Sequence, residues 1–426
     1  MRRYRKTYFY LLLLLPAMLC FCGCGNLYTG EEMPINTPED PDTPQWPETE
    51  EVPIMIAFTD PSYSVLTRGQ GPFEAGTELG KRNWTNARFY VYAFRSDNPE
   101  GMTFATTRQE DSEICLVDGS TQSTPDLNHG CMAKLTEYEG GSFFTWTDET
   151  DQLYYSSLAQ INPFNFFAYH IDDAVVSNFV RGTDDIRFDL EIDGTQDVLG
   201  AVARPTQEQL NNIENLTDET ERENVRKYLY STYTAHRNFH PVLQMQHYLT
   251  RLKFQAFPGN TEESIYIQAV KVNSRCSGTF IVAAKDTTQV GLEFPEDRAR
   301  KDFVLCDTTG LPLPEDSFLI ATTPEDLAYD YVYDRHPVDL GESGMLVVPD
   351  DSYRLTLELK QHFNDGRPDA TYTTEYDIAV AGGFKAGTQY TLRIAVYGLE
   401  EIKVDVVITP WNDGGFVDVE PDEGFD

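Results

Sequence analysis

The feature that most constrains the fold is a long succession of short apolar and aromatic runs separated by turn-forming residues. Examples are Arg88–Arg95, Phe164–His170, Ile186–Ile192, Leu252–Phe257 and Tyr353–Leu359. Runs of about 4–8 residues have the length of strands rather than of helices. Many short strands at such spacing are typical of β-sandwiches, whereas strands that alternate with helices would indicate a parallel α/β fold. We therefore predict an all-β chain.

Composition supports this fold class and excludes one class of partner. The 426 residues include 24 Tyr and 25 Phe, and aromatic residues of this abundance favour sheets and argue against a disordered chain. The formal net charge is −36. A surface this acidic repels nucleic acid and anionic lipid headgroups, so we expect no nucleic-acid partner.

One helical insertion interrupts the strands between Leu210 and His236. Apolar residues recur there at helical spacing, and Thr220 with Glu223 has the pattern of a capping box. We predict a surface helix near the end of a first domain, packed across its sandwich. A second series of strands begins at Pro241, which places the domain boundary near Asn238. The expected domains are residues 52–237 and 238–426.

The N-terminus has the form of an export signal. Basic residues precede Tyr8–Phe21, an apolar run of 14 residues. A membrane span needs about 20 apolar residues, so this run is too short to cross a bilayer and fits a signal peptide. Gly23 supplies the small residue that lipidation requires before a modified cysteine. We predict residues 1–24 as a lipoprotein signal with Cys24 as the acylated mature N-terminus; a plain secretory signal is the alternative.

An acidic, proline-rich linker is predicted over residues 25–51. Glu31–Glu51 contains eight acidic residues, five prolines and no basic residue, so it cannot form a core and is kept extended. The first predicted strand, Val52–Phe58, follows it. Ile54, Ile56 and Phe58 lie on one face of that strand. Because Met55 and Ala57 make the other face apolar too, we expect burial on both faces.

Four further cysteines form two local pairs in the sequence. In an exported protein, Cys115 with Cys131 and Cys276 with Cys306 are candidate disulfides, and four buried thiols are the alternative. No cysteines are spaced for a zinc site. His236 and His240 stand four residues apart, but no acidic residue is placed beside them. We therefore expect no bound metal and no other cofactor.

Three stretches of the second half resemble the fimbrillin family, the lipoprotein pilins of protease-assembled (type V) fimbriae of Gram-negative anaerobes. The stretches are Met245–Phe257, Phe384–Val396 and Val406–Gly415. Their order, together with the lipoprotein start and the acidic linker, is more specific than any one of them. The residues that match the family pattern are His247, Leu249, Arg251, Gly387, Tyr390 and Trp411.

The resemblance implies two tandem transthyretin-like β-sandwich domains and assembly by donor-strand complementation. It implies cleavage after Arg68 and displacement of the strand that carries Ile54, Ile56 and Phe58. The partners would be other pilin subunits, and Cys24 would anchor the precursor in the outer membrane. The acidic tail Asp413–Asp426 makes a poor donor strand, which leaves stalk, tip and anchor roles open.

The sequence contains none of the common catalytic motifs that would indicate an enzyme. The chain has no G-x-S-x-G, no H-E-x-x-H and no P-loop, so we predict no catalytic residue. An exported hydrolase would need a constellation that the sequence does not display. The competing hypothesis is a surface lipoprotein that never polymerises and binds a glycan or a host protein through exposed aromatic side chains.

Overall fold

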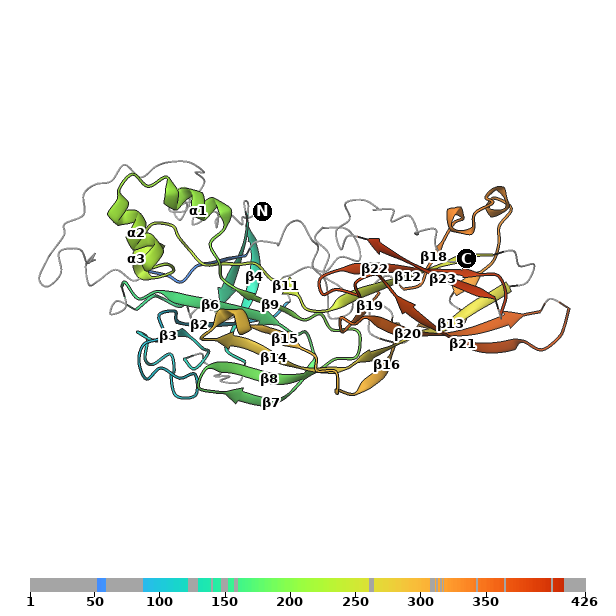
Figure 1. The fold of residues 1–426 in the computed structure, drawn as a ribbon, viewed down its shortest axis with the longest axis horizontal. Coiled ribbons are helices and arrows are strands. Elements are labelled where there is room, and N and C mark those ends of the chain that lie inside the picture. Colours follow the sequence, from blue (N-terminus) through green and yellow to red (C-terminus); the bar gives the residue numbers. More distant parts are fainter. Residues whose placement is uncertain are drawn as a thin grey trace, which may run out of the picture. The chain divides into compact units, whose positions relative to one another are not determined.

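The computed structural model describes fourteen parts of the chain, all within the compact unit Pro47–Asp426. They are residues 52–58, 87–121, 129–138, 141–146, 152–156, 160–259, 264–306, 311, 313–314, 316, 318–341, 344–363, 365–399 and 401–409. Strands dominate these residues, and the helices are few and short (Figure 1). The predicted all-β class is confirmed.

The first sandwich pairs a nine-stranded sheet with a four-stranded one. The larger sheet has the order β10-β1-β5-β4-β2-β6-β9-β11, with β3 beside β2. Its strands are β1 (Ile56–Phe58), β2 (Phe89–Arg95), β3 (Cys115–Val117), β4 (Cys131–Tyr138), β5 (Gly141–Trp146), β6 (Phe164–His170), β9 (Leu199–Val202), β10 (Val242–Leu243) and β11 (Gln246–His247). The smaller sheet contains β15 (Gly291–Glu293), β14 (Ser277–Ala284), β8 (Asp185–Glu191) and β7 (Val175–Arg181).

Aromatic side chains hold these two sheets together. The ring of Tyr169 on β6 lies 5.6 Å from that of Phe188 on β8 and 5.7 Å from that of Phe280 on β14. Phe188 and Phe280 are themselves 5.7 Å apart in an edge-to-face contact. All three side chains are almost fully buried. Edge-to-face packing adds to the stabilisation that aromatic burial already supplies.

The second sandwich is built from two five-stranded sheets. One contains β18 (Val338–Asp339), β12 (Thr250–Pro258), β22 (Gln389–Val396) and β23 (Ile402–Thr409) in that order, with β19 (Met345–Val347) beside β12. The other contains β16 (Arg300–Val304), β13 (Ser264–Arg275), β20 (Ser352–His362) and β21 (Ala370–Ala379), with β17 (Phe318–Ile320) beside β13. On β20, Tyr353, Leu355, Leu357 and Leu359 alternate with more exposed residues and point into the core.

The helical insertion is present, but it consists of three short helices. These are α1 (Gln207–Glu214), α2 (Glu219–Lys227) and α3 (Thr232–Ala235). The predicted capping box of Thr220 and Glu223 is wrong, because α2 begins earlier and its N-cap is Asp218, whose carboxylate accepts hydrogen bonds from the amides of Thr220 and Glu221. A small core of their own joins the helices: Ile213, Val225, Tyr228, Tyr233 and Phe239. No helix in the described residues is long and apolar enough to cross a membrane.

Strands from both sides of the expected boundary near Asn238 share sheets. β1 pairs with β10, β9 pairs with β11, and β8 pairs with β14 along most of its length. The second series of strands therefore completes both sheets of the first sandwich. The division into residues 52–237 and 238–426 stays a prediction. Within the described residues, single-turn 3-10 helices lie in connections: η2 (Thr287–Gln289), η3 (Asp326–Ala328) and η4 (Val332–Asp334).

Candidate functional site

β1 is an interior strand of the nine-stranded sheet. It pairs antiparallel with β5, with Ile56 opposite Phe144, and parallel with β10, with Ala57 opposite Val242. Backbone hydrogen bonds to neighbouring segments also hold β1 and the residues before it. The amide of Ile54 donates to the carbonyl of Leu153 (2.8 Å), and the amide of Ala57 donates to that of Pro241 (2.9 Å). Without β1, the facing edges of β5 and β10 would lose their partner.

Only one face of this strand is buried, so the prediction of burial on both faces is wrong. Val52, Ile54 and Ile56 are 7%, 2% and 0% exposed and belong to the core cluster on that side of the sheet. Met55 is 44% exposed. Side chains of that core cluster cover Ile54 and Ile56, and nothing among the described residues covers Met55 to the same extent. The side chain of Phe58 lies outside what the structure describes.

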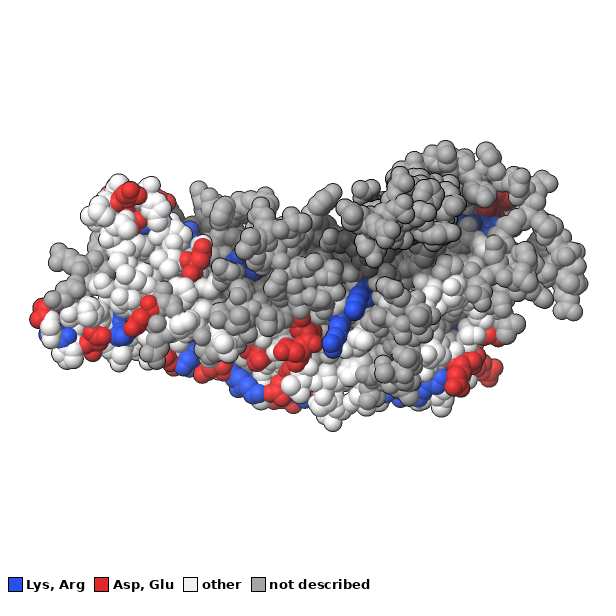
Figure 2. All heavy atoms as spheres, turned by 180° about the vertical axis from the view of Figure 1, so that it is seen from behind, with Lys and Arg blue, Asp and Glu red and all other residues white. Residues whose placement is uncertain are grey.

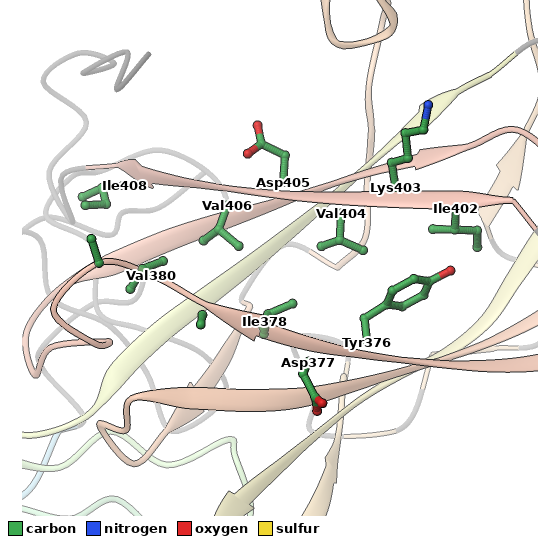
Figure 3. Close-up of a pocket in the computed structure, with 12 residues that line it drawn as sticks. Tyr376, Asp377, Ile378, Val380, Ile402, Lys403, Val404, Asp405, Val406 and Ile408 are labelled. Atoms are coloured by element: carbon green, nitrogen blue, oxygen red, sulfur yellow. The ribbon is translucent and has the colours of Figure 1, made fainter. Parts of the chain in front are cut away.

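A second feature is a groove between β21 and β23, the outer strands of the two sheets of the second sandwich (Figure 3). Its volume is about 640 Å³. Figure 3 shows side chains from β23 and from the β21 segment pointing toward one another across it, while Lys403 and Asp405 point away. The apolar side chains that line it are Tyr376, Ile378, Val380, Ile402, Val404, Val406 and Ile408.

The walls of this groove are two sheet edges. Among the described strands, β21 pairs only with β20 and β23 pairs only with β22. Among the described residues, each therefore has one backbone edge without a strand partner, beside an apolar slot. Such an edge accepts an added strand through ladder hydrogen bonds, with alternate side chains filling the slot. The sequence signal was the apolar alternation of Ile402, Val404, Val406 and Ile408, but only the sheet order shows that this face meets β21.

The structure brings the first two family-like stretches together. β12 and β22 pair in parallel, with Arg251 opposite Gln389. The hydroxyl of Thr250 donates to the carbonyl of Lys385 (2.8 Å), and the amide of Gly387 donates to that of Leu249 (2.9 Å). Leu249 and Arg251 are both buried.

Gly387 and Tyr390 shape the turn into β22. Gly387 has φ +65°, a left-handed conformation that residues with a side chain rarely adopt. The hydroxyl of Tyr390 accepts a hydrogen bond from the amide of Lys385 (3.1 Å), and its ring packs against Phe384 at 4.8 Å. These residues serve the packing of the second sandwich, and His247 contributes a buried contact with Asp197.

Among the described residues, neither predicted disulfide forms. β13 and β16 pair with Arg275 opposite Arg300, which places Cys276 at one end of the ladder. The amide of Leu305 donates to the carbonyl of Val270, so Cys306 follows at the opposite end, level with Ala269. Seven residues of strand, roughly 23 Å, separate these ends. A disulfide requires Cα atoms within about 7 Å.

Cys115 and Cys131 are separated by the sheet itself. Both lie along one edge of β2, where Cys131 is opposite Val91 and Cys115 is opposite Phe94. Cys115 packs into the core cluster on one face and Cys131 into the cluster on the other. Side chains on opposite faces cannot meet. Burial, together with the neighbouring carboxylate of Asp118, raises the pKa of the Cys115 thiol well above its usual value.

Several predicted site residues lie outside the described part of the chain: Cys24, Arg68 and Trp411. Within the described part, no group of three or more His, Cys, Asp and Glu side chains could hold a metal ion. His236 closes α3 as its C-cap residue. Burial lowers the pKa of His240.

No known family profile and no curated protein sequence matches this chain. Solved structures similar to it include cell-adhesion and fimbrial proteins. A candidate cell adhesion protein from Bacteroides ovatus is 14% identical, covering 85% of this chain and 98% of its own, with a TM-score of 0.41. The fimbrial anchor protein Mfa2 from Porphyromonas gingivalis is 12% identical. The match covers 85% of this chain and 98% of Mfa2, with a TM-score of 0.31. A fimbrial assembly protein from Parabacteroides distasonis is 6% identical. The match covers 84% of this chain and 99% of that protein, with a TM-score of 0.30.

Proposed function

We propose that this chain is a structural or adhesive subunit of surface fimbriae, exported as a lipoprotein, and that its β1 strand is replaced by a strand from another subunit. The observation that carries the proposal is the position of β1 between β5 and β10. An interior strand whose loss leaves two edges and an apolar slot is what strand donation requires.

The slot would be deep enough for a stable joint. Val52, Ile54 and Ile56 fill it with three aliphatic side chains that are at most 7% exposed. Burying each such side chain contributes roughly 1.5–3 kcal/mol. An incoming strand with the same alternation would recover this stabilisation together with the hydrogen bonds of the ladder.

The chain path suits a cut that releases β1. The next described strand, β2, begins at Phe89, and residues 59–88 connect β1 to it. A cut anywhere in this connection would separate β1 from all the other strands and helices. The connection contains three arginines, Arg68, Arg82 and Arg88, and the proposal places the cut at Arg68.

Strand exchange can be tested with a peptide that copies residues 51–58. The chain without its signal is treated with an arginine-specific protease and then mixed with the labelled peptide. The proposal expects peptide binding only after cleavage. A peptide with Ile56→Asp should fail to bind, whereas one with Met55→Asp should bind, because Met55 points to solvent. Cleaved protein that stays monomeric and binds neither peptide would contradict the proposal.

The cleavage site and the acceptor site need separate controls. Arg68→Ala should leave the lipidated precursor unassembled in cells, and Arg82→Ala should assemble normally; equal assembly of both would remove Arg68 from the mechanism. Chemical cross-linking then locates the peptide. Cross-links to β5 or β10 support replacement of β1, whereas cross-links confined to β21 or β23 would assign strand addition to the groove of Figure 3.

A further inference from the structure

The connection between β17 and β18 presents three large apolar side chains to solvent. Leu327, Tyr329 and Tyr331 are 67%, 40% and 53% exposed. We call residues 323–336 the tyrosine loop; it is the orange segment that projects near β18 in Figure 1. Exposed tyrosines this close together on one loop are a common feature of binding surfaces, since their rings offer a large rigid contact area.

A buried carboxylate fixes the base of the tyrosine loop. Asp326 is 1% exposed. Its Oδ2 accepts hydrogen bonds from the amide (2.9 Å) and the hydroxyl (2.6 Å) of Thr323. Its Oδ1 accepts one from the amide of His336 (3.1 Å) and lies 3.0 Å from Nδ1 of the His336 ring. The two ends of the loop are therefore tied to one side chain.

Arg335 and Val332 dock the loop on the outer face of the sheet. The guanidinium of Arg335 donates to the carbonyl of Pro258 (2.8 Å), at the end of β12, and to that of Tyr329 (3.3 Å). Val332 is buried against Phe257 of β12 and Ala395 of β22. These contacts brace the loop, and a preorganised surface binds with a smaller loss of conformational entropy.

The two exposed tyrosines, Tyr329 and Tyr331, are separated by a single residue. The backbone is extended at Tyr329 and at Tyr331 and bends at Asp330 between them. The Tyr331 ring packs edge-on against Tyr333 at 5.4 Å. Tyr333 is itself braced by Phe257 at 5.2 Å and by the guanidinium of Arg393, 4.6 Å from the ring centre. The outer surface of Tyr331 stays in solvent.

We infer that the tyrosine loop binds a neutral glycan, with Tyr329 and Tyr331 stacking on pyranose rings. The charge around the rings selects this chemistry. Glu325, Asp330 and Asp334 are exposed, whereas Arg335, the one lysine or arginine of the tyrosine loop, is buried. Carboxylates accept hydrogen bonds from sugar hydroxyls. The same carboxylates repel sulfated and sialylated chains.

The size of the surface favours a sugar over a protein partner. A stable protein complex buries roughly 800 Å² on each partner. Three side chains at the tip of one loop cannot supply that area, whereas two phenol rings can cover one or two pyranose rings. Figure 2 shows the corresponding projection at the upper left as white surface with acidic groups in red. The inference does not depend on strand exchange, because it involves neither β1 nor its neighbours.

The test is binding of the full-length protein to a printed array that carries neutral, sulfated and sialylated oligosaccharides. We expect binding to neutral oligosaccharides, with an affinity that changes less than about twofold when the ionic strength rises from about 0.05 to about 0.5 M. The double variant Tyr329→Ala/Tyr331→Ala should lower that affinity about tenfold or more. Tyr372→Ala is the matched control, since Tyr372 is 39% exposed on β21 and should not change binding.

Further variants separate binding from folding. Tyr329→Phe/Tyr331→Phe keeps both rings and should bind within about threefold of the original chain. Tyr329→Ala alone removes a ring whose described ring contact is only an edge approach to His336 at 6.2 Å, so it should leave the thermal unfolding midpoint unchanged while weakening binding. The inference is overturned if no neutral oligosaccharide binds, if only charged ones bind, or if Tyr329→Ala/Tyr331→Ala binds as well as Tyr372→Ala.

Discussion

The carboxylate of Asp197 lies 3.0 Å from Nδ1 of His247, and both side chains are almost fully buried. The amide of Asp197 in turn donates to the carboxylate of Asp172 (2.9 Å), which lies 2.8 Å from Nε2 of His170. Two His–Asp pairs are thereby linked through one backbone amide. The network fixes β11, which carries His247, beside β9 and at the end of β6. Buried polar groups stabilise a fold only when they are satisfied together.

Removing the imidazole of His247 from this network should destabilise the fold. His247→Leu leaves the buried carboxylate of Asp197 without that partner, and we expect the free energy of unfolding to fall by about 2–4 kcal/mol. The matched control is His362→Leu. His362 makes the same kind of contact with Asp369 at 2.8 Å, but its side chain is 53% exposed. An exposed pair contributes about 1 kcal/mol or less to the free energy of unfolding. Denaturant titration of both variants measures the difference; equal losses would refute the structural role of the network.

The one-sided burial of β1 gives a second prediction. Ile56→Ala removes a fully buried side chain and should lower the free energy of unfolding by about 2–5 kcal/mol. Met55→Ala, on the neighbouring exposed residue, should change it by about 0.5 kcal/mol or less. Thermal and denaturant unfolding of the uncleaved chain provide the measurement. A similar loss for both would mean that the Met55 face is covered as well.

The strands that sequence predicts well are those with a strong buried face. Arg88–Arg95 and Tyr353–Leu359 reappear nearly unchanged as β2 and β20, whose apolar side chains are buried. β7 was not predicted from the sequence, because it is an edge strand with mostly exposed side chains. Its backbone is also distorted at Asn178, which has φ +50°. β16 (RKDFV) was not predicted either, because Phe303 is its only buried residue.

What sequence could not supply was the pairing of segments far apart in the chain. The two family-like stretches suggested related strands, but their contact through Thr250 and Lys385 depends on the parallel β12–β22 register. The same limit affected the cysteines. Nearness in sequence suggested disulfides, whereas strand register and sheet face separate each pair.

The thiols therefore give a third prediction. Alkylation of the protein after unfolding without reductant should label all four cysteines, and no peptide should join Cys276 to Cys306. In the native state at pH 8, Cys306, which is partly exposed, should react first. Cys115 should stay unlabelled, because its pKa is raised by burial and the thiolate is the reactive species. Mass spectrometry of peptides reads each site. A Cys276–Cys306 link would require a different β13–β16 register.

The tyrosine loop gives the fourth prediction, through the charge state of Asp326. Burial alone would raise the pKa of this carboxyl, but hydrogen bonds from Thr323 and His336 outweigh burial and hold the pKa far below its usual range. The folded state thus favours the carboxylate. Its contribution to stability is complete above the unfolded pKa of about 3.9 and is lost as the pH falls through the lower folded value.

Asp326→Asn should lower the free energy of unfolding by about 1–3 kcal/mol at pH 7. This difference from the original chain should be constant between about pH 7 and pH 5 and should shrink only below about pH 4. The matched control is Asp330→Asn, an exposed carboxylate of the same loop, which should change stability by about 0.5 kcal/mol or less across the whole range. Denaturant titrations at each pH measure both variants. A difference that already declines between pH 7 and pH 5 would mean that a group other than Asp326 controls the loop.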